Sequence, residues 1–320
     1  MRHKHFQIPL LLFFVSLLAS CEKMMMEEAG GQGTNSTNHN VVIRVADMDA
    51  GWDGANSRAQ VPISEVCSRL QFAVYKDGSR VKSENQIVGD GSFGVLSLQL
   101  ESGTYQLLVL GHSGAANVTT TKPEKLQFTN PTASNGTGFT DTFYHYGDMV
   151  VSSEGAQVDI SMKRATSMFR LKTNDGKPGN VKKFQFYYTG GSGALDAITG
   201  LGCVNSKQTV PVALEDSLTG RPLTFEMYTI LRQESAVVTF TVTAYDDSDN
   251  VLYTKEFKAQ MRRNCITQYT GSFFTSGEGD TPDTPVVPPS DDDDVPPFGE
   301  TSSGFVYVDP EWADVFEYTY

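Results

Sequence analysis

The sequence is poor in basic residues and in cysteine, and its N-terminal apolar run is short. It carries 25 Lys and Arg against 38 Asp and Glu, a formal net charge of −13 at pH 7. It contains no basic cluster interleaved with aromatic residues, so the composition argues against binding to nucleic acid. The apolar run from Ile8 to Ala19 is shorter than the roughly 20 residues that a transmembrane helix needs.

Cysteine is scarce, and the number of cysteines that follow Cys21 is odd. Beyond Cys21 the chain holds Cys67, Cys203 and Cys265, so at least one thiol stays unpaired within a monomer. A disulfide framework therefore does not organise the fold. Cys203 and Cys265 are a candidate disulfide pair in an oxidising compartment. Two buried free thiols are the alternative, since free cysteine behaves as a small core residue.

The motifs of catalysis and metal binding are also missing. The histidines after the N-terminal segment are His39, His112 and His145, which are too far apart for a local metal site. The run from Gly89 to Gly94 has the glycine spacing of a dinucleotide loop, but no helix follows it. We therefore predict no enzyme, no catalytic residue, no metal and no cofactor. A hydrolase on a β-sandwich scaffold is the least supported alternative.

The first twenty residues have the layout of a secretory signal. Arg2 and Lys4 precede the apolar run, and Leu18-Ala19-Ser20 leads into Cys21. This order is that of a signal peptide and its junction is that of a bacterial lipobox. We therefore predict a signal peptide over residues 1–20 and acylation of Cys21. Several acyl chains would give a stable membrane anchor.

From residue 41 onward, short apolar runs of period two alternate with turn residues, as in half-buried strands. The pair Asp77-Gly78 predicts a tight hairpin turn. A second hairpin with one buried face is predicted around Glu101-Ser102-Gly103, and a long loop is predicted from about Asn117 to Thr142. The chain is therefore predicted to be all-β, with two tandem β-sandwich domains over residues 41–165 and 166–275. Residues 21–40 are predicted to be a flexible tether.

The C-terminal extension, residues 276–320, begins as an acidic Pro-rich linker with the run Asp291 to Asp294. Its end regains aromatic side chains, and these form the candidate partner-binding tail: Phe305, Tyr307, Trp312, Phe316 and Tyr318. Two alternatives stay open for this tail. It is either a disordered tail with scattered aromatic residues or a strand that docks on a sheet edge.

Several phrases together resemble the FimB-like family of fimbrial subunits and anchor lipoproteins of Bacteroidetes. They are Cys21, the hairpin phrase from Leu100 to Leu107, the phrase Met162-Lys163-Arg164-Ala165-Thr166, and the phrase from Asn264 to Gly271. The resemblance covers most of residues 21–275. It implies two transthyretin-like β-sandwich domains and an outer-membrane lipid anchor, and it implies that subunits join by addition of a strand. The extension after about Gly277 has no counterpart in an anchor subunit.

The first functional hypothesis is accordingly a lipid-anchored fimbrial subunit. It would be the basal anchor that attaches the shaft to the outer membrane, on the cell surface, and limits the shaft's length. The partners would be the membrane, through the acyl chains, and other fimbrial subunits. The second hypothesis is an adhesin-like surface lipoprotein that binds glycan or host protein through its loops and aromatic tail.

The role of Cys21 is directly testable. In Cys21→Ala the chain has no thiol to receive the diacylglycerol, so we expect the protein to leave the membrane fraction. Detergent phase partitioning of cell envelopes, with mass spectrometry of the N-terminal peptide, measures this. A variant that still partitions with the detergent and the membrane contradicts the predicted anchor.

Overall fold

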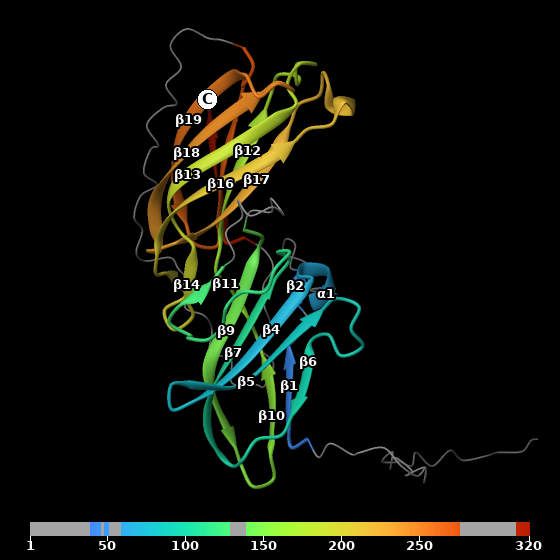
Figure 1. Ribbon diagram of the computed structural model, residues 1–320, viewed down its shortest axis with the longest axis vertical. Coiled ribbons are helices and arrows are strands. Elements are labelled where there is room, and N and C mark those ends of the chain that lie inside the picture. Colours follow the sequence, from blue (N-terminus) through green and yellow to red (C-terminus); the bar gives the residue numbers. More distant parts are fainter. Residues whose placement is uncertain (1–38, 46–47, 51–58, 129–138, 276–311) are drawn as a thin grey trace, which may run out of the picture. The chain divides into compact units, whose positions relative to one another are not determined.

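The computed structural model describes residues 39–45, 48–50, 59–128, 139–275 and 312–320, and within these ranges nearly all regular structure is β (Figure 1). The predicted signal peptide, most of the tether and the acidic linker lie outside the described residues. No helix in the described part of the chain has both the length and the apolar character to cross a membrane. The all-β prediction is confirmed.

Two sheets enclose the first core. The smaller has the strand order β10-β1-β6 and the larger the order β11-β9-β7-β4-β5. The strands of these sheets are β1 (Val41–Val45), β4 (Arg69–Lys76), β5 (Ser79–Ile87), β6 (Val95–Leu98), β7 (Gly103–His112), β9 (Thr142–Val151), β10 (Ala156–Ile160) and β11 (Lys163–Arg164). We call these two sheets the N-terminal sandwich. The short helix α1 (Ile63–Val66) precedes β4.

The second half forms one folded-over sheet with the order β19-β18-β13-β17-β12-β20-β21, in which β16 pairs with the other edge of β13. Its strands are β12 (Ser167–Thr173), β13 (Lys183–Ser192), β16 (Asn205–Ala213), β17 (Thr224–Leu231), β18 (Ser235–Tyr245), β19 (Val251–Arg262), β20 (Cys265–Gly271) and β21 (Asp314–Thr319). The last residues of β13 reach β17 and join the two layers. We call this unit the C-terminal sandwich.

Shorter elements make up the rest of the regular structure in the described residues. A small sheet of order β15-β14-β8 contains strands from both halves of the sequence, and β2 pairs with β3. These elements are β2 (Met48–Ala50), β3 (Ala59–Val61), β8 (Leu126–Gln127), β14 (Ala194–Asp196), β15 (Leu201–Gly202) and the 3-10 turn η1 (Asp216–Leu218). Residues 38–320 fall in one unit by their contacts, so the predicted boundary at residue 165 stays a prediction.

The period-two pattern places side chains as the sequence predicts. In β1, Val41 and Ile43 are fully buried whereas Arg44 is exposed. The hairpin between β4 and β5 turns at Asp77 and Gly78, whose φ angles of 52° and 74° lie in the left-handed region. Such angles suit a tight turn that matches the twist of the flanking strands. The first predicted hairpin is therefore confirmed.

The second predicted hairpin is wrong. β6 pairs with β1 in the smaller sheet, whereas β7 pairs with β4 and β9 in the larger one. The turn at Glu101-Ser102-Gly103 therefore carries the chain from one sheet to the other. Both strands still face the same core, to which Leu98 and Leu107 contribute. Alternation fixes the buried face of a strand, but it does not identify the strand's partner.

The prediction of one buried face is also wrong for β7. Leu107 and Val109 point into the N-terminal core, while Leu108 and Leu110 lie in a separate cluster on the opposite face. That cluster includes Leu195 of β14. The predicted long loop from Asn117 to Thr142 contributes Leu126 of β8 to it. The larger sheet of the N-terminal sandwich is therefore covered on both faces.

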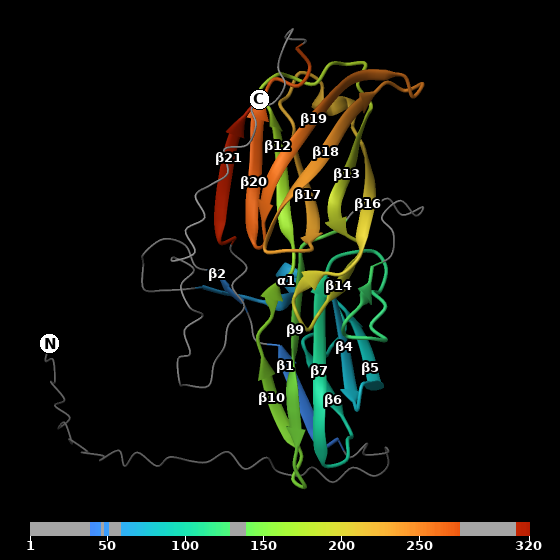
Figure 2. The same ribbon diagram turned by 90° about the vertical axis from the view of Figure 1, so that its left-hand side faces the viewer.

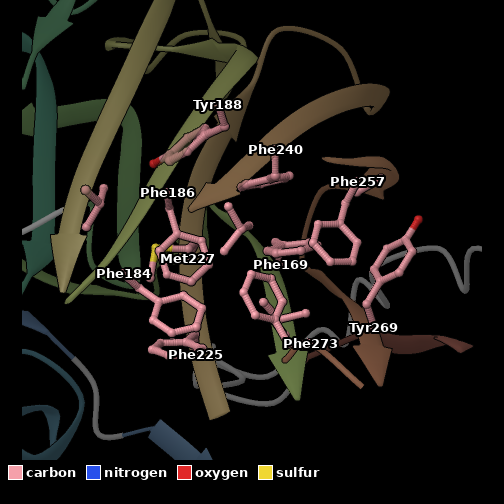
Figure 3. Packing of buried hydrophobic residues seen from close by; sticks show 14 of the residues in the cluster. Phe169, Phe184, Phe186, Tyr188, Phe225, Met227, Phe240, Phe257, Tyr269 and Phe273 are labelled. Atoms are coloured by element: carbon pink, nitrogen blue, oxygen red, sulfur yellow. The ribbon is translucent and has the colours of Figure 1, made fainter. Parts of the chain in front are cut away.

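Aromatic side chains fill the core of the C-terminal sandwich (Figure 3). Phe169 of β12 stacks on Phe240 of β18 with ring centroids 4.0 Å apart and planes 14° apart. Phe257 and Tyr269 approach each other edge to face at 5.2 Å. Such aromatic pairs contribute about 0.5–1.5 kcal/mol beyond the burial of their area. The two layers are thus held together by interdigitated rings.

Substitutions at two glycines can distinguish the cost of backbone strain from the cost of close packing. Gly155 and Gly89 have φ angles of +99° and +100°, but a Cβ on Gly155 would overlap the carbonyl oxygen of Asn40 whereas one on Gly89 meets nothing. We expect Gly89→Ala to lower the free energy of unfolding by about 1–2 kcal/mol, the strain of a left-handed alanine. Gly155→Ala should cost about 1–3 kcal/mol more because of overpacking. Equal losses in denaturant titrations would contradict this account.

Candidate functional site

The C-terminal strand β21 docks on the edge of the C-terminal sandwich. It pairs in parallel with β20, from Cys265 beside Asp314 to Thr270 beside Thr319 (Figure 2). Two backbone bonds extend this ladder, because Ala313 N–H donates to the Asn264 carbonyl at 2.7 Å and Tyr320 N–H donates to the Thr270 carbonyl at 3.1 Å. Residues 314–319 thus form a strand that docks on a sheet edge, which is one of the two alternatives left open for the tail.

One face of this strand is aromatic and lies against the sheet. Tyr318 stacks on Tyr269 with centroids 5.0 Å apart, and Tyr320 meets the ring of Phe257 edge to face at 4.9 Å. The Tyr320 hydroxyl also donates to the carbonyl of Lys172 at 3.3 Å. Burial raises the pKa of both tail tyrosines above its ordinary value. Their hydroxyls therefore stay neutral at physiological pH.

The other face and the outer edge of β21 are open. Val315 is 43% exposed, and Asp314, Glu317 and Thr319 are exposed. In the part of the chain that the structure describes, no strand pairs with the outer edge of β21, which ends its sheet. An open edge strand presents unpaired N–H and C=O groups to another chain. This edge is where the structure offers backbone pairing to a partner.

Trp312, just before β21, stacks on a buried arginine. The guanidinium carbon of Arg164 lies 4.0 Å from the centre of the Trp312 ring and 4.9 Å from that of Phe143. A guanidinium between two aromatic faces is a favourable cation–π arrangement, worth about 2 kcal/mol or more when it is desolvated. Trp312 thus fixes the start of the C-terminal strand to the rest of the protein.

The same guanidinium connects the two sandwiches. Its Nε and Nη2 atoms donate to both carboxylate oxygens of Asp141 at 2.9 to 3.1 Å. Its Nη1 atom donates to the side-chain oxygen of Asn264 at 2.8 Å. Asn264 has a φ of 58° and occupies the turn between β19 and β20. We call Arg164, Asp141, Asn264 and Trp312 the Arg164 junction.

The predicted site residues fall into three groups. Cys21, Phe305 and Tyr307 lie outside the described residues. Phe316 and Tyr318 lie in β21 and share one face of it by the period-two rule, and Trp312 lies just before the strand. Their binding to a partner stays a prediction. In the structure Cys203 is an exposed free thiol and Cys265 is a buried one. A disulfide between Cys203 and Cys265 stays a prediction.

Sequence reasoning missed the roles of Arg164, Asp141 and Asn264. Two of the phrases that carry the family resemblance meet at this junction, because Arg164 belongs to the first and Asn264 opens the second. No spacing rule links them, since they lie 100 residues apart in sequence. Within the described residues, no three His, Cys, Asp or Glu side chains are grouped as a metal site.

The fold and the docked strand thus define a protein built from β-sandwiches, with strand pairing available at a sheet edge. The family model of the fimbrillin-A associated anchor proteins Mfa1 and Mfa2 matches residues 37–296. The chain belongs to this family of fimbrial anchor proteins, which is a family of structural proteins. Among curated proteins, none matches the chain.

Solved structures of three bacterial proteins resemble the chain at low sequence identity. One described as an adhesin from Bacteroides ovatus is 11% identical, with a TM-score of 0.47, and the match covers 72% of this chain and 87% of that one. The fimbrial anchor protein Mfa2 from Porphyromonas gingivalis is 13% identical, with a TM-score of 0.37 and coverages of 68% and 82%. A fimbrial assembly protein from Parabacteroides distasonis is 11% identical, with a TM-score of 0.33 and coverages of 68% and 84%.

The thiols provide a test of the site's packing. Burial raises the pKa of Cys265 to about 11 and that of Cys67 to about 12. Their reactive thiolates therefore form only as the pH rises toward those values. We expect alkylation at pH 8 to label the exposed Cys203 first, and the two buried thiols only after unfolding. Peptide mass spectrometry without reductant measures this.

Equal labelling of Cys203 and Cys265 in the folded protein would contradict the buried position of Cys265. A linked pair of peptides containing Cys203 and Cys265 would instead establish the candidate disulfide. Cys67, which has no proposed partner, serves as the internal control for a buried thiol.

Proposed function

We propose that this chain is a lipid-anchored fimbrial subunit, the basal anchor that attaches a fimbrial shaft to the outer membrane at the cell surface and limits the shaft's length. Cys21 is the point of attachment, and residues 21–40 form the tether between the membrane and the first sandwich. The division into domains 41–165 and 166–275 belongs to this proposal. Membership in the fimbrial anchor family is the observation that carries it.

Strand exchange is the proposed mode of contact with the shaft. β21 is an edge strand whose outer residues are exposed, and residues 272–313 separate it from β20, the strand with which it pairs. Because a strand held by one ladder and a long connection can pair with another chain instead, we propose that β21 leaves β20 and fills a groove of the adjoining shaft subunit. Its pairing with β20 is then the state before assembly.

The contacts at the start of β21 oppose this release. Trp312 stacks on Arg164, and Tyr318 and Tyr320 pack against the core of the C-terminal sandwich. These contacts keep the strand on its own chain until a partner offers a deeper groove. The strength of the Trp312 contact therefore sets how readily the strand is released.

In the adhesin-like alternative, the same tail would have to bind a glycan or a host protein. A glycan-binding site requires an accessible aromatic face, but Trp312 is half-buried and lies over the Arg164 guanidinium. The docked tail is therefore poorly suited to stacking on a sugar. This geometry favours the fimbrial proposal over the glycan-binding one.

The test is affinity purification of a chromosomally tagged protein from detergent-solubilised envelopes, followed by mass spectrometry. We expect a fimbrial shaft subunit to co-purify with the wild type and to be lost when residues 312–320 are deleted. Trp312→Ala should have the opposite effect and raise the amount captured, because it removes the contact with Arg164 that holds the start of β21 on its own chain. Val237→Ala changes an exposed apolar residue of β18 that is 52% exposed and serves as the control.

The outcomes separate the two functions. Loss on deletion with a gain in Trp312→Ala supports strand exchange. Capture that the deletion leaves unchanged contradicts the role of β21, and capture of glycan or host proteins without any fimbrial subunit favours the surface-binding function.

A further inference from the structure

In the N-terminal sandwich, β1, where the chain enters, lies beside β10, from which the chain continues to the C-terminal sandwich. β1 pairs in parallel with β10 along its whole length, from Val41 beside Ala156 to Val45 beside Ile160 (Figure 1). The chain enters this pair at Val41 and leaves it at Ile160. Because the two strands are parallel, these two points lie at opposite ends of one hydrogen-bonded ladder.

The C-terminal sandwich repeats this arrangement. The chain enters at β12, which pairs in parallel with β20 from Met168 beside Ile266 to Thr173 beside Gly271. β20 pairs in parallel with β21 in turn (Figure 2). The chain enters at the Met168 end and leaves β20 at the Gly271 end. The incoming and outgoing strands of both sandwiches are thus parallel neighbours.

This topology determines how the ladders respond to tension between the two ends of the chain. When one strand is pulled at its start and its parallel neighbour at its end, the force runs along the ladder and loads its hydrogen bonds together. A pair pulled at the same end opens one bond at a time. Rupture of a folded protein under force is set by its unfolding rate, and loading bonds together slows that rate.

The point where tension enters the first ladder is reinforced by Asn40. Its side-chain amide donates to the Leu100 carbonyl at 2.8 Å and accepts from the Leu100 N–H at 3.0 Å. Its own carbonyl accepts from the Ala156 N–H at 3.0 Å. One residue therefore ties the start of β1 to both neighbouring parts of the sandwich. Gly155 lets the chain approach this closely, since a Cβ there would overlap the Asn40 carbonyl.

The connection between the sandwiches is also held on both sides. Between β10 and β12, Arg164 is bound to Asp141 of the N-terminal sandwich and to Asn264 at the start of β20. The N–H of Ala165 donates to the Thr142 carbonyl at 2.8 Å. Tension that leaves β10 thus meets a buried ion pair and a backbone bond before it reaches β12.

We infer that this protein is a tension-bearing element in which the parallel pairs β1 with β10 and β12 with β20 are clamps loaded in shear, and Asn40 reinforces the first of them. The inference deepens the proposed anchor, since a tether at the N-terminus and a shaft at the C-terminal strand would apply this tension. The clamps themselves depend on neither the lipid nor the shaft.

The test is single-molecule force spectroscopy on the purified chain from residue 22 to 320, in a Cys203→Ser background that leaves no exposed thiol among the described residues. In one geometry the handles are at the N-terminus and at Thr275→Cys, an exposed residue shortly after β20, so that release of β21 does not contribute. In the other they are at the N-terminus and at Ser153→Cys, an exposed turn residue beside the start of β10. The second geometry pulls β1 and β10 apart from the same end. We expect the first rupture to need a higher force in the first geometry than in the second.

Two asparagine variants test the proposed reinforcement. Asn40→Ala removes both side-chain bonds to Leu100 and should raise the rupture rate of the N-terminal sandwich at constant load by about 30-fold, the equivalent of two net hydrogen bonds. Asn85→Ala removes a bond from Gln71 at 2.9 Å in the edge strand β5, outside the loaded pair. It should leave that rate unchanged.

Equal forces in the two geometries would overturn the inference, as would equal effects of the two asparagine variants. If Asn40→Ala does not fold, the comparison of geometries on the background protein still decides the question. The result is independent of the anchor proposal. If Cys21 is not acylated but the shear force is high, only the anchor proposal is refuted. If the protein is acylated and bound to fimbriae but the shear force is low, only the clamps are refuted.

Discussion

The buried guanidinium of Arg164 is the interaction on which the arrangement of the described chain depends. Its side chain is 2% exposed and pairs with Asp141, which is 23% exposed. Removing one partner of such a pair costs about 3–5 kcal/mol, because the other charge is left buried without compensation. The same group also binds the turn before β20 and stacks under Trp312. The connection between the sandwiches and the position of the tail therefore share one cation.

The period-two pattern predicted the all-β fold and the alternation of buried and exposed residues seen in β1, because alternation follows directly from the pleat of a strand. It failed where partners had to be chosen. β6 and β7 alternate as a hairpin would, yet they belong to different sheets. β16 contains Pro211, and its place on a sheet edge is where proline is tolerated.

The site was predictable only in part. The aromatic tail was recognised from composition, and the strand that residues 314–319 form was one of two open alternatives. The Arg164 junction was not recognised, because its members come together only through the pairing of β11 with β9 and the turn before β20. A buried charge that bridges distant segments leaves no periodic signal in a sequence.

Family, fold and topology support one account of the protein. The family is one of fimbrial anchor proteins, the docked C-terminal strand offers a sheet edge for assembly, and the parallel pairs suit a chain held at both ends. In this account the N-terminus is attached to the membrane and the C-terminal strand binds the shaft. The sandwiches between them carry the tension.

The most direct measurement of this account is the distribution of fimbriae between cells and medium, determined by electron microscopy and immunoblotting in strains that express either the wild type or Cys21→Ala at equal levels. The account predicts that fimbriae stay on wild-type cells, and that in the Cys21→Ala strain they are released into the medium with the variant protein at one end. Fimbriae that remain attached in equal number and length on cells of both strains would contradict it.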